Sequence, residues 1–339
     1  MNMKPWTQAN CIRSVGLVCL WAALLVSQTS CTSVKVKLGW KVYLAQTPVS
    51  SIEASLPNGP GIAPGQKSPL VITVKQPDGK VLLTEGKGGG KVMWKDLVVT
   101  PTVVQVNQKG VVSLARDPRI SDGKTGHVTI TVPSHPDLRA ELDIPFRYDA
   151  KFTANFSGSS GVSGLNGSDG MDGTSGSMGS MDPNNPSPGG NGGDGTDGGN
   201  GQDGGAGGDA PSVQVMVTVE AGGHPLLQVS VAASAKTRLY LIDPQGGSLT
   251  VSADGGSGGT GGRGGRGGRG GSGGIGTPNG SSGRDGLDGR NGFDGSQGRG
   301  GLITVTYDPQ AKAYLHVVHL SSQNGPRPVF REDTVAALW

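Results

Sequence analysis

The chain has 339 residues, of which 62 are glycine, and its formal net charge is +3. Residues 1–30 contain two basic side chains, Lys4 and Arg13, and no acidic one, so the remainder has a net charge of +1 and no overall basic field to attract nucleic acid. Aromatic residues make up 4% and hydrophobic residues 34%, which is low for a folded chain, but the glycines are concentrated in two blocks and the rest has an ordinary composition that can form β domains.

Residues 1–30 have the pattern of a secretory signal peptide. Lys4 and Arg13 precede an uncharged apolar run at residues 15–26, and small polar residues follow it. This run is shorter than the about 20 residues that a helix needs to cross a bilayer, which favours export over a permanent membrane span.

Cys31 follows the letters VSQTS, and this stretch resembles the lipoprotein box of bacterial lipoproteins, in which the cysteine carries the lipid. Gln28 departs from the leucine that the family prefers, and an incidental cysteine near an ordinary cleavage site is the alternative. Because Cys11 and Cys19 lie within the expected signal peptide, a chain beginning at Cys31 forms no internal disulfide. The resemblance implies a lipid anchor at Cys31 and, with Thr32 beside it, a place at the outer membrane or cell surface.

Residues 33–156 are a succession of short β-type runs separated by turn signals. LVITV at 70–74 and VTITV at 128–132 alternate with period two, and Pro-Asn-Gly at 57–59 and Pro-Asp-Gly at 77–79 mark turns. About seven such runs predict a β-sandwich. The pattern resembles the immunoglobulin-like modules of bacterial surface proteins, although it lacks their intersheet disulfide.

Glycine then recurs with a period of three, in four runs. Residues 157–210 contain run one (158–179) and run two (189–208), and residues 255–301 contain run three (255–276) and run four (280–301). Turns that contain proline separate the two runs of each pair. Residues 211–254, between the pairs, return to β patterning. Residues 302–339 hold closing strands, expected at 302–308 and 313–320, and a tail.

A three-residue glycine period indicates polyproline II segments, because every third residue of that helix lies on the same edge and a glycine leaves the edge bare. Runs one and four look like collagen Gly-X-Y but contain no proline, whereas collagen depends on imino acids. Runs two and three are mostly Gly-Gly-X, which leaves two edges bare for neighbours. A flexible disordered linker is the alternative, although a linker needs no phase.

This pattern resembles the glycine-rich helix bundles of the Obg GTPase N-terminal domain and of the springtail antifreeze proteins, and the chain also resembles collagen-like, glycine-rich bacterial surface lipoproteins. The resemblance implies antiparallel polyproline II segments with runs two and three inside and runs one and four outside. The predicted fold class is mainly β: an N-terminal Ig-like β-sandwich, then a glycine-rich polyproline II helix bundle clamped by β-strands. Whether the protein is a monomer or a collagen-like trimer stays open.

The remaining edge of run three carries a stripe of arginines, Arg263, Arg266 and Arg269. The stripe is a solvated face first of all, with attraction between arginine and aspartate setting the register of the runs. As a binding site it would hold phosphate or sulfate groups of a surface polysaccharide, lipopolysaccharide or extracellular DNA. The context disfavours an RNA-binding tail, because no aromatic residue is interleaved for stacking bases, we expect the chain to be exported, and similar runs nearby carry aspartate instead.

Run two carries aspartates that match part of the calcium-binding nonapeptide repeat. GGNGGD at 189–194 and GGNGQD at 198–203 fit its first six places, but Thr196 and Gly205 occupy its apolar position and cannot build the core of a calcium roll. A Ca²⁺ site formed by Asp194, Asp197 and Asp203 is therefore a weak hypothesis, and no other cofactor is expected.

The sequence gives little sign of catalysis. It contains no HExxH or phosphate-binding loop pattern, and the G-x-S-x-G letters at 255–259 and 270–274 are part of the glycine repeat, so we do not expect an enzyme. We expect an exported, lipid-anchored surface protein with a structural or adhesive role, whose partners are the membrane, through its anchor, and other cell-surface components. A binding module for polyanionic glycan or Ca²⁺ is the alternative.

Overall fold

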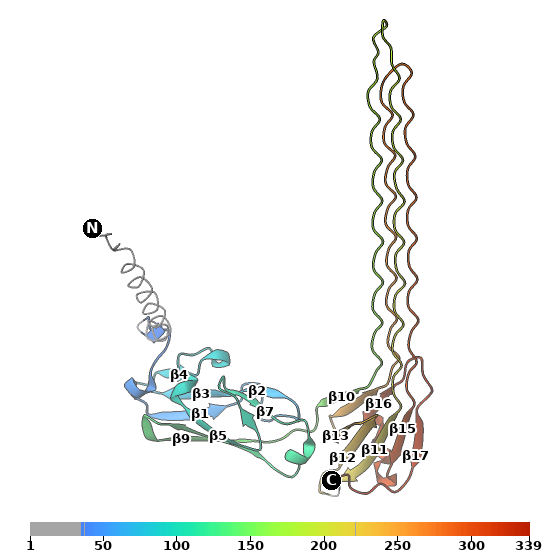
Figure 1. Cartoon of the computed structure of the whole chain (residues 1–339). Coiled ribbons are helices and arrows are strands. Elements are labelled where there is room, and N and C mark those ends of the chain that lie inside the picture. Colours follow the sequence, from blue (N-terminus) through green and yellow to red (C-terminus); the bar gives the residue numbers. More distant parts are fainter. Residues whose placement is uncertain (1–34, 37, 221) are drawn as a thin grey trace, which may run out of the picture. The chain divides into compact units, whose positions relative to one another are not determined.

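The computed structural model describes residues 35–36, 38–220 and 222–339. The chain divides into two compact units, Met1–Tyr148 and Asp149–Trp339, and strands are the main regular element of both (Figure 1). The prediction of a mainly β chain is therefore confirmed. Within the described residues, no helix has the length and apolar character needed to cross a bilayer.

The described part of the first unit contains three small antiparallel sheets. Their strand orders are β1-β3-β4, β2-β7-β6 and β5-β8-β9. The strands are β1 (Ser51–Ser55), β2 (Lys67–Pro69), β3 (Val71–Lys75), β4 (Val81–Leu83), β5 (Val98–Thr102), β6 (Gln105–Val106), β7 (Val111–Ser113), β8 (Gly126–Val132) and β9 (His135–Ile144). Short 3-10 helices lie at η1 (Leu44–Gln46), η2 (Gly86–Gly88), η3 (Trp94–Asp96) and η4 (Pro118–Ile120).

One hydrophobic core joins the three sheets of the first unit. Strand β8 shows how the alternation works, because Val128, Ile130 and Val132 are fully buried while the residues between them are partly exposed. Ile72 from β3 and Val112 from β7 belong to the same cluster. Burying each such side chain contributes about 1.5–3 kcal/mol, so the alternating letters fix which face of each strand points inward.

The second unit contains a five-stranded sheet and a three-stranded sheet. The five-stranded sheet has the order β13-β12-β11-β15-β17, and the three-stranded sheet, β10-β14-β16, is entirely parallel. The elements are β10 (Lys151–Asn155), β11 (Val213–Glu220), β12 (Leu226–Ala233), β13 (Lys236–Ile242), β14 (Ser248–Ser252), β15 (Ile303–Tyr307), the 3-10 helix η5 (Pro309–Val317), β16 (Val318–Ser321) and β17 (Val329–Glu332). We expected residues up to 156 to belong to the first domain, but β10 pairs with β14 and lies in the second unit.

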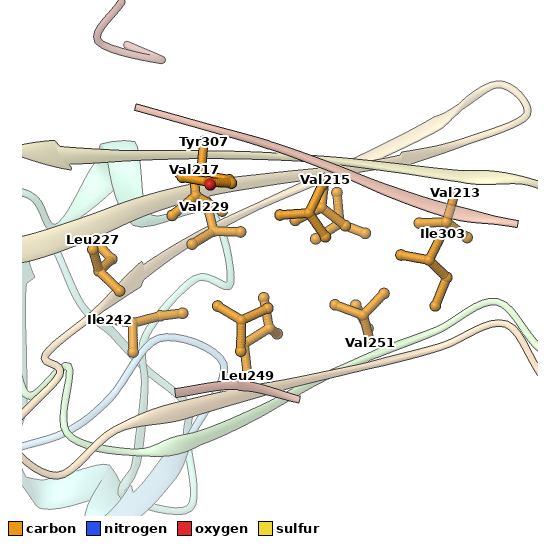
Figure 2. Close-up of a cluster of buried hydrophobic side chains, with 14 of the residues drawn as sticks. Val213, Val215, Val217, Leu227, Val229, Ile242, Leu249, Val251, Ile303 and Tyr307 are labelled. Carbon is orange, nitrogen blue, oxygen red and sulfur yellow. The ribbon is translucent and has the colours of Figure 1, made fainter. Parts of the chain in front are cut away.

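The core of the second unit lies between its two sheets. Figure 2 shows Leu249 and Val251 of β14 facing side chains of the other sheet, among them Val215 and Val229. All four side chains are fully buried. The two sheets are thus held face to face by apolar packing, and we call this part the β core of the second unit.

The four glycine-rich runs leave this β core as two long hairpins (Figure 1). The hairpin of runs one and two connects β10 to β11, and the hairpin of runs three and four connects β14 to β15. We call the four runs together the array, defined by residues 158–179, 189–208, 255–276 and 280–301.

Candidate functional site: the hydrogen-bonded glycine array

Run one pairs with run three in the same chain direction. Gly158 N–H donates to Asp254 O at 2.9 Å, and every third residue repeats the bond until Gly179 N–H donates to Ile275 O at 2.7 Å. The pairing continues that of the strands before it, because β10 and β14 are also parallel and Phe156 N–H donates to Ser252 O at 2.8 Å. The strand pair therefore sets the register of this pair of runs.

Runs two and four show the same continuity with β11 and β15. Gly192 N–H donates to Ser281 O at 2.9 Å, the bond repeats along both runs in the same direction, and β11 pairs with β15 in parallel. Runs two and three are antiparallel to each other, as Gly256 N–H shows by donating to Gly208 O at 2.9 Å and Gly259 N–H by donating to Gly205 O at 2.9 Å. Each sheet of the β core thus supplies one parallel pair of runs.

Runs two and three each bond to all three other runs. Run two donates to run one as well, for example from Gly190 N–H to Ser177 O at 2.8 Å, and run four donates to run three from Gly280 N–H to Gly274 O at 2.8 Å. Among the described residues, no backbone hydrogen bond joins run one to run four. Runs two and three are therefore the inner members of the array, and runs one and four are the outer members.

Close approach of the backbones explains why glycine is required. A Cβ added at Gly192 would clash with the carbonyl of Gly271, a backbone group that cannot move aside. A Cβ added at Gly193, the next residue, would lie 3.1 Å from Thr174 Oγ1, which is a side-chain atom. The equivalent positions later in run two accept Thr196 and Gln202. The first glycine of each triplet in run two is therefore structurally obligatory, and the second is not.

Aspartate and asparagine side chains accept hydrogen bonds from backbone N–H groups that do not donate to a carbonyl of another run. Asp288 Oδ1 accepts from Gly267 N–H at 2.8 Å, and Asn291 Oδ1 accepts from Gly264 N–H at 2.9 Å. The same contact joins run two to run four and run one to run three. Its acceptors are Asn166, Asp169 and Asp172 in run one, Asn191, Asp194, Asp197, Asn200 and Asp203 in run two, Asp209 directly after run two, and Asp285, Asp288, Asn291 and Asp294 in run four.

The arginine stripe lies between two rows of these acceptors. The main-chain N–H groups of Arg263, Arg266 and Arg269 donate to Asn166, Asp169 and Asp172 Oδ1 of run one at 2.9, 2.8 and 2.7 Å, while run four places its own acceptors on the other flank of run three. The three arginine side chains are exposed. In the described part of the chain they form no ion pair within 4.0 Å. Register between the runs is thus carried by backbone donors, and the stripe is bordered by carboxylates.

Asp194, Asp197 and Asp203 lie on the same edge of run two, with Asn200 between the last two, and contact the backbone of run four. Their Oδ1 atoms accept from the N–H groups of Arg284, Leu287 and Phe293 at 2.7, 2.7 and 2.8 Å. No group of three or more histidine, cysteine, aspartate or glutamate side chains in the described residues is arranged to hold a metal ion. Cys31, the expected lipidation site, lies outside the described residues.

A cavity of about 660 Å³ in the first unit was not foreseen from the sequence. It is lined by Lys35, Lys41, Glu85, Met93, Trp94, Lys95, Leu97, Val99, Val106, Asn107 and Gln108. Its sequence signal is the pair of stretches KVKLGWK at 35–41 and KGGGKVMWK at 87–95, which place lysines around tryptophans.

Among the described residues that line this cavity, Glu85 is the one acidic residue, and its neighbours hold it in place. Lys41 Nζ lies 2.8 Å from Glu85 Oε2, and Trp94 N–H donates to Oε1 at 3.2 Å. Burial alone would raise the pKa of Glu85, but the hydrogen bonds from Lys41 and Trp94 outweigh it and hold the pKa below its ordinary value. The negative charge of Glu85 is therefore paired with Lys41, and the cavity lining contains two more lysines, Lys35 and Lys95.

Comparison with models of known protein families and with curated proteins found no match to this chain.

Proposed function

We propose that the protein is exported, is lipid-anchored at Cys31 and has a structural or adhesive role at the cell surface. The array is its projecting element, built of polyproline II helices, and the first unit is an immunoglobulin-like module at the anchored end of the chain. The observation that carries the proposal is the ladder of glycine N–H bonds, which repeats at every triplet along all four runs.

This ladder makes the array suited to a mechanical role. At about 3.1 Å per residue, run one would be about 68 Å long. A single extended chain of that length is flexible, but each run here is bonded to at least two others along its whole length. Lateral hydrogen bonds replace the apolar core that such a composition cannot provide.

Exposed apolar side chains on the outer runs support adhesion. Leu165 and Met171 of run one are 68% and 77% exposed, and Leu287 and Phe293 of run four are 73% and 80% exposed. When such an exposed apolar side chain is covered by a partner, the free energy of binding becomes more favourable in proportion to the apolar area removed from water.

Amide hydrogen exchange tests the array. We expect the glycine amides that donate between runs to exchange about 100-fold or more slowly than those of an unstructured peptide of the same sequence, because exchange requires opening of the ladder. Exchange of residues 158–208 and 255–301 at the free-peptide rate would contradict the proposed element.

Lipid attachment and adhesion are tested separately. We expect Cys31→Ser to abolish labelling by a palmitate analogue in cells, while the control Cys19→Ser keeps it.

Cells that display Leu165→Ser together with Phe293→Ser should be retained less on an apolar surface than cells that display the control Ser296→Ala, which alters the same edge of run four. Unchanged retention of the double variant would remove the adhesive role and leave the structural one.

A further inference from the structure

The first described residues form a turn that exposes two large apolar side chains. Leu38 is 56% exposed and Trp40 is 62% exposed. The turn is closed by Trp40 N–H, which donates to Lys35 O at 2.8 Å, and Gly39 has the positive φ of 71° that the turn needs. Both apolar side chains are therefore held at the surface by a defined turn.

Lysines surround this turn. Lys35, Lys41 and Lys95 line the cavity of about 660 Å³, and Lys91 is adjacent because its carbonyl accepts from Val42 N–H at 3.1 Å. We call Leu38, Trp40 and these four lysines the lysine patch.

Two acidic groups lie near the lysine patch, Glu85 in the cavity lining and Asp96 next to Lys95 in the chain, and both have partners within the protein. Glu85 is paired with Lys41, and Asp96 Oδ2 accepts from Leu44 N–H at 3.2 Å. Lys91 and Lys95 form no ion pair within the described part of the chain, and Lys95 Nζ lies 5.1 Å from the centre of the Tyr43 ring. The patch therefore presents uncompensated positive charge next to exposed apolar groups.

That combination fits the surface of a bilayer that contains anionic phospholipid. Tryptophan prefers the headgroup layer, and lysine side chains near an anionic bilayer are attracted to its phosphates. We propose that the lysine patch docks on such a bilayer, with Leu38 and Trp40 in the headgroup layer and Lys91 and Lys95 on lipid phosphates. The cavity beside them, with the amides of Asn107 and Gln108 in its lining, has room for a headgroup.

The position of the patch in the chain supports a bilayer as the partner. Lys35 comes four residues after Cys31, and four extended residues span at most about 14 Å. A lipid at Cys31 would keep the patch within reach of the bilayer, so that even weak docking is populated. The inference thus deepens the proposed location and rests on it for the presence of a membrane.

Vesicle binding tests the docking without the lipid anchor. Residues 32–339, which contain both cores, are mixed with vesicles of phosphatidylcholine alone or of phosphatidylcholine with phosphatidylglycerol, and the bound fraction is measured by sedimentation. We expect binding to the mixed vesicles only, and weaker binding as salt is raised. Removing each lysine should weaken it about fivefold, so Lys91→Gln with Lys95→Gln should bind about 25-fold more weakly. Trp40→Ala should also bind more weakly.

The control variant Lys151→Gln with Lys236→Gln makes the same change of net charge in the second unit and should bind like the unaltered chain. Thermal unfolding shows that each variant is folded. Equal binding to both kinds of vesicle, or equal binding by the two double variants, would overturn the proposal. So would stabilisation by glycerol phosphate without any vesicle binding, which would assign the cavity to a soluble phosphorylated compound. Any of these results leaves Cys31 labelling and array exchange unaffected, and so leaves the proposed function standing.

Discussion

The second unit contains two regions that are held together in opposite ways. In the β core, side chains such as Leu249 and Val229 point inward and are fully buried. In the array, glycine backbones contact one another and the side chains are exposed. The β core gains its stability from apolar burial. The array depends on hydrogen bonds between backbones that lie so close together that only glycine fits at the contact positions.

The comparison also shows that the array depends on the β core. Ordering glycine costs more backbone entropy than ordering any other residue, and each net hydrogen bond returns only about 0.5–1.5 kcal/mol. The two parallel strand pairs, β10 with β14 and β11 with β15, deliver the runs already in register. The strand pairs of the β core thus bring the first residues of the runs together, and the runs extend the ladder of hydrogen bonds from there.

The largest expected effect is therefore in the β core. Leu249→Ala removes a fully buried side chain between the two sheets, and we expect the free energy of unfolding to fall by about 2–5 kcal/mol. Chemical denaturation followed by tryptophan fluorescence and circular dichroism measures it, and Leu249→Met, which keeps the volume, should cost less than about 1.5 kcal/mol. A loss below about 1 kcal/mol for Leu249→Ala would show that the array, not the β core, holds the unit together.

The next effect separates two neighbouring glycines of run two. Gly192→Ala places a Cβ against the Gly271 carbonyl, so nearby inter-run bonds must break at a cost of about 1–3 kcal/mol. Gly193→Ala meets only side-chain and amide atoms at 3.1–3.2 Å, and we expect a change below about 1 kcal/mol. Local hydrogen exchange in runs one to four measures the difference, and equal exchange in the two variants would contradict the close packing of backbones.

A smaller effect is expected from the side-chain acceptors of the array. Asp288→Ala leaves Gly267 N–H without its acceptor and should cost about 0.5–1.5 kcal/mol. Asp288→Asn keeps an Oδ1 atom in place, as Asn291 does for Gly264, and should be nearly neutral. Faster exchange of the Gly267 amide in the alanine variant alone would show that the hydrogen bond to Oδ1 protects this amide. Equally faster exchange in both variants would show that the negative charge of Asp288 protects it.

The smallest effect is expected from the arginine stripe. Replacing Arg263, Arg266 and Arg269 by serine keeps the main-chain N–H groups that bond to run one, so stability should change by less than about 0.5 kcal/mol. Thermal unfolding checks this. A larger loss would mean that the guanidinium groups, which form no ion pair in the described structure, hold the runs together in solution.

Several features followed from local pattern. The alternation in VTITV identified the buried residues of β8, and the glycine period identified the residues whose N–H groups donate between runs. Other features did not follow. Residues 313–320 read as a strand, but η5 extends to Val317 and β16 begins at Val318, because Asp308 Oδ1 accepts from Gln310 N–H and Pro309 starts the helix. The cavity beside Trp94 was not predicted, since its lining comes from three separated segments.

The sequence by itself determined where backbone can approach backbone, because only glycine leaves an edge free, and it determined which faces of the strands are apolar. Only the tertiary structure decided which runs are partners and in which direction, because a repeat with identical triplets is compatible with many registers. Strand pairing in the β core selects one of them: the stagger of β10 against β14, and of β11 against β15, passes directly into the runs that follow.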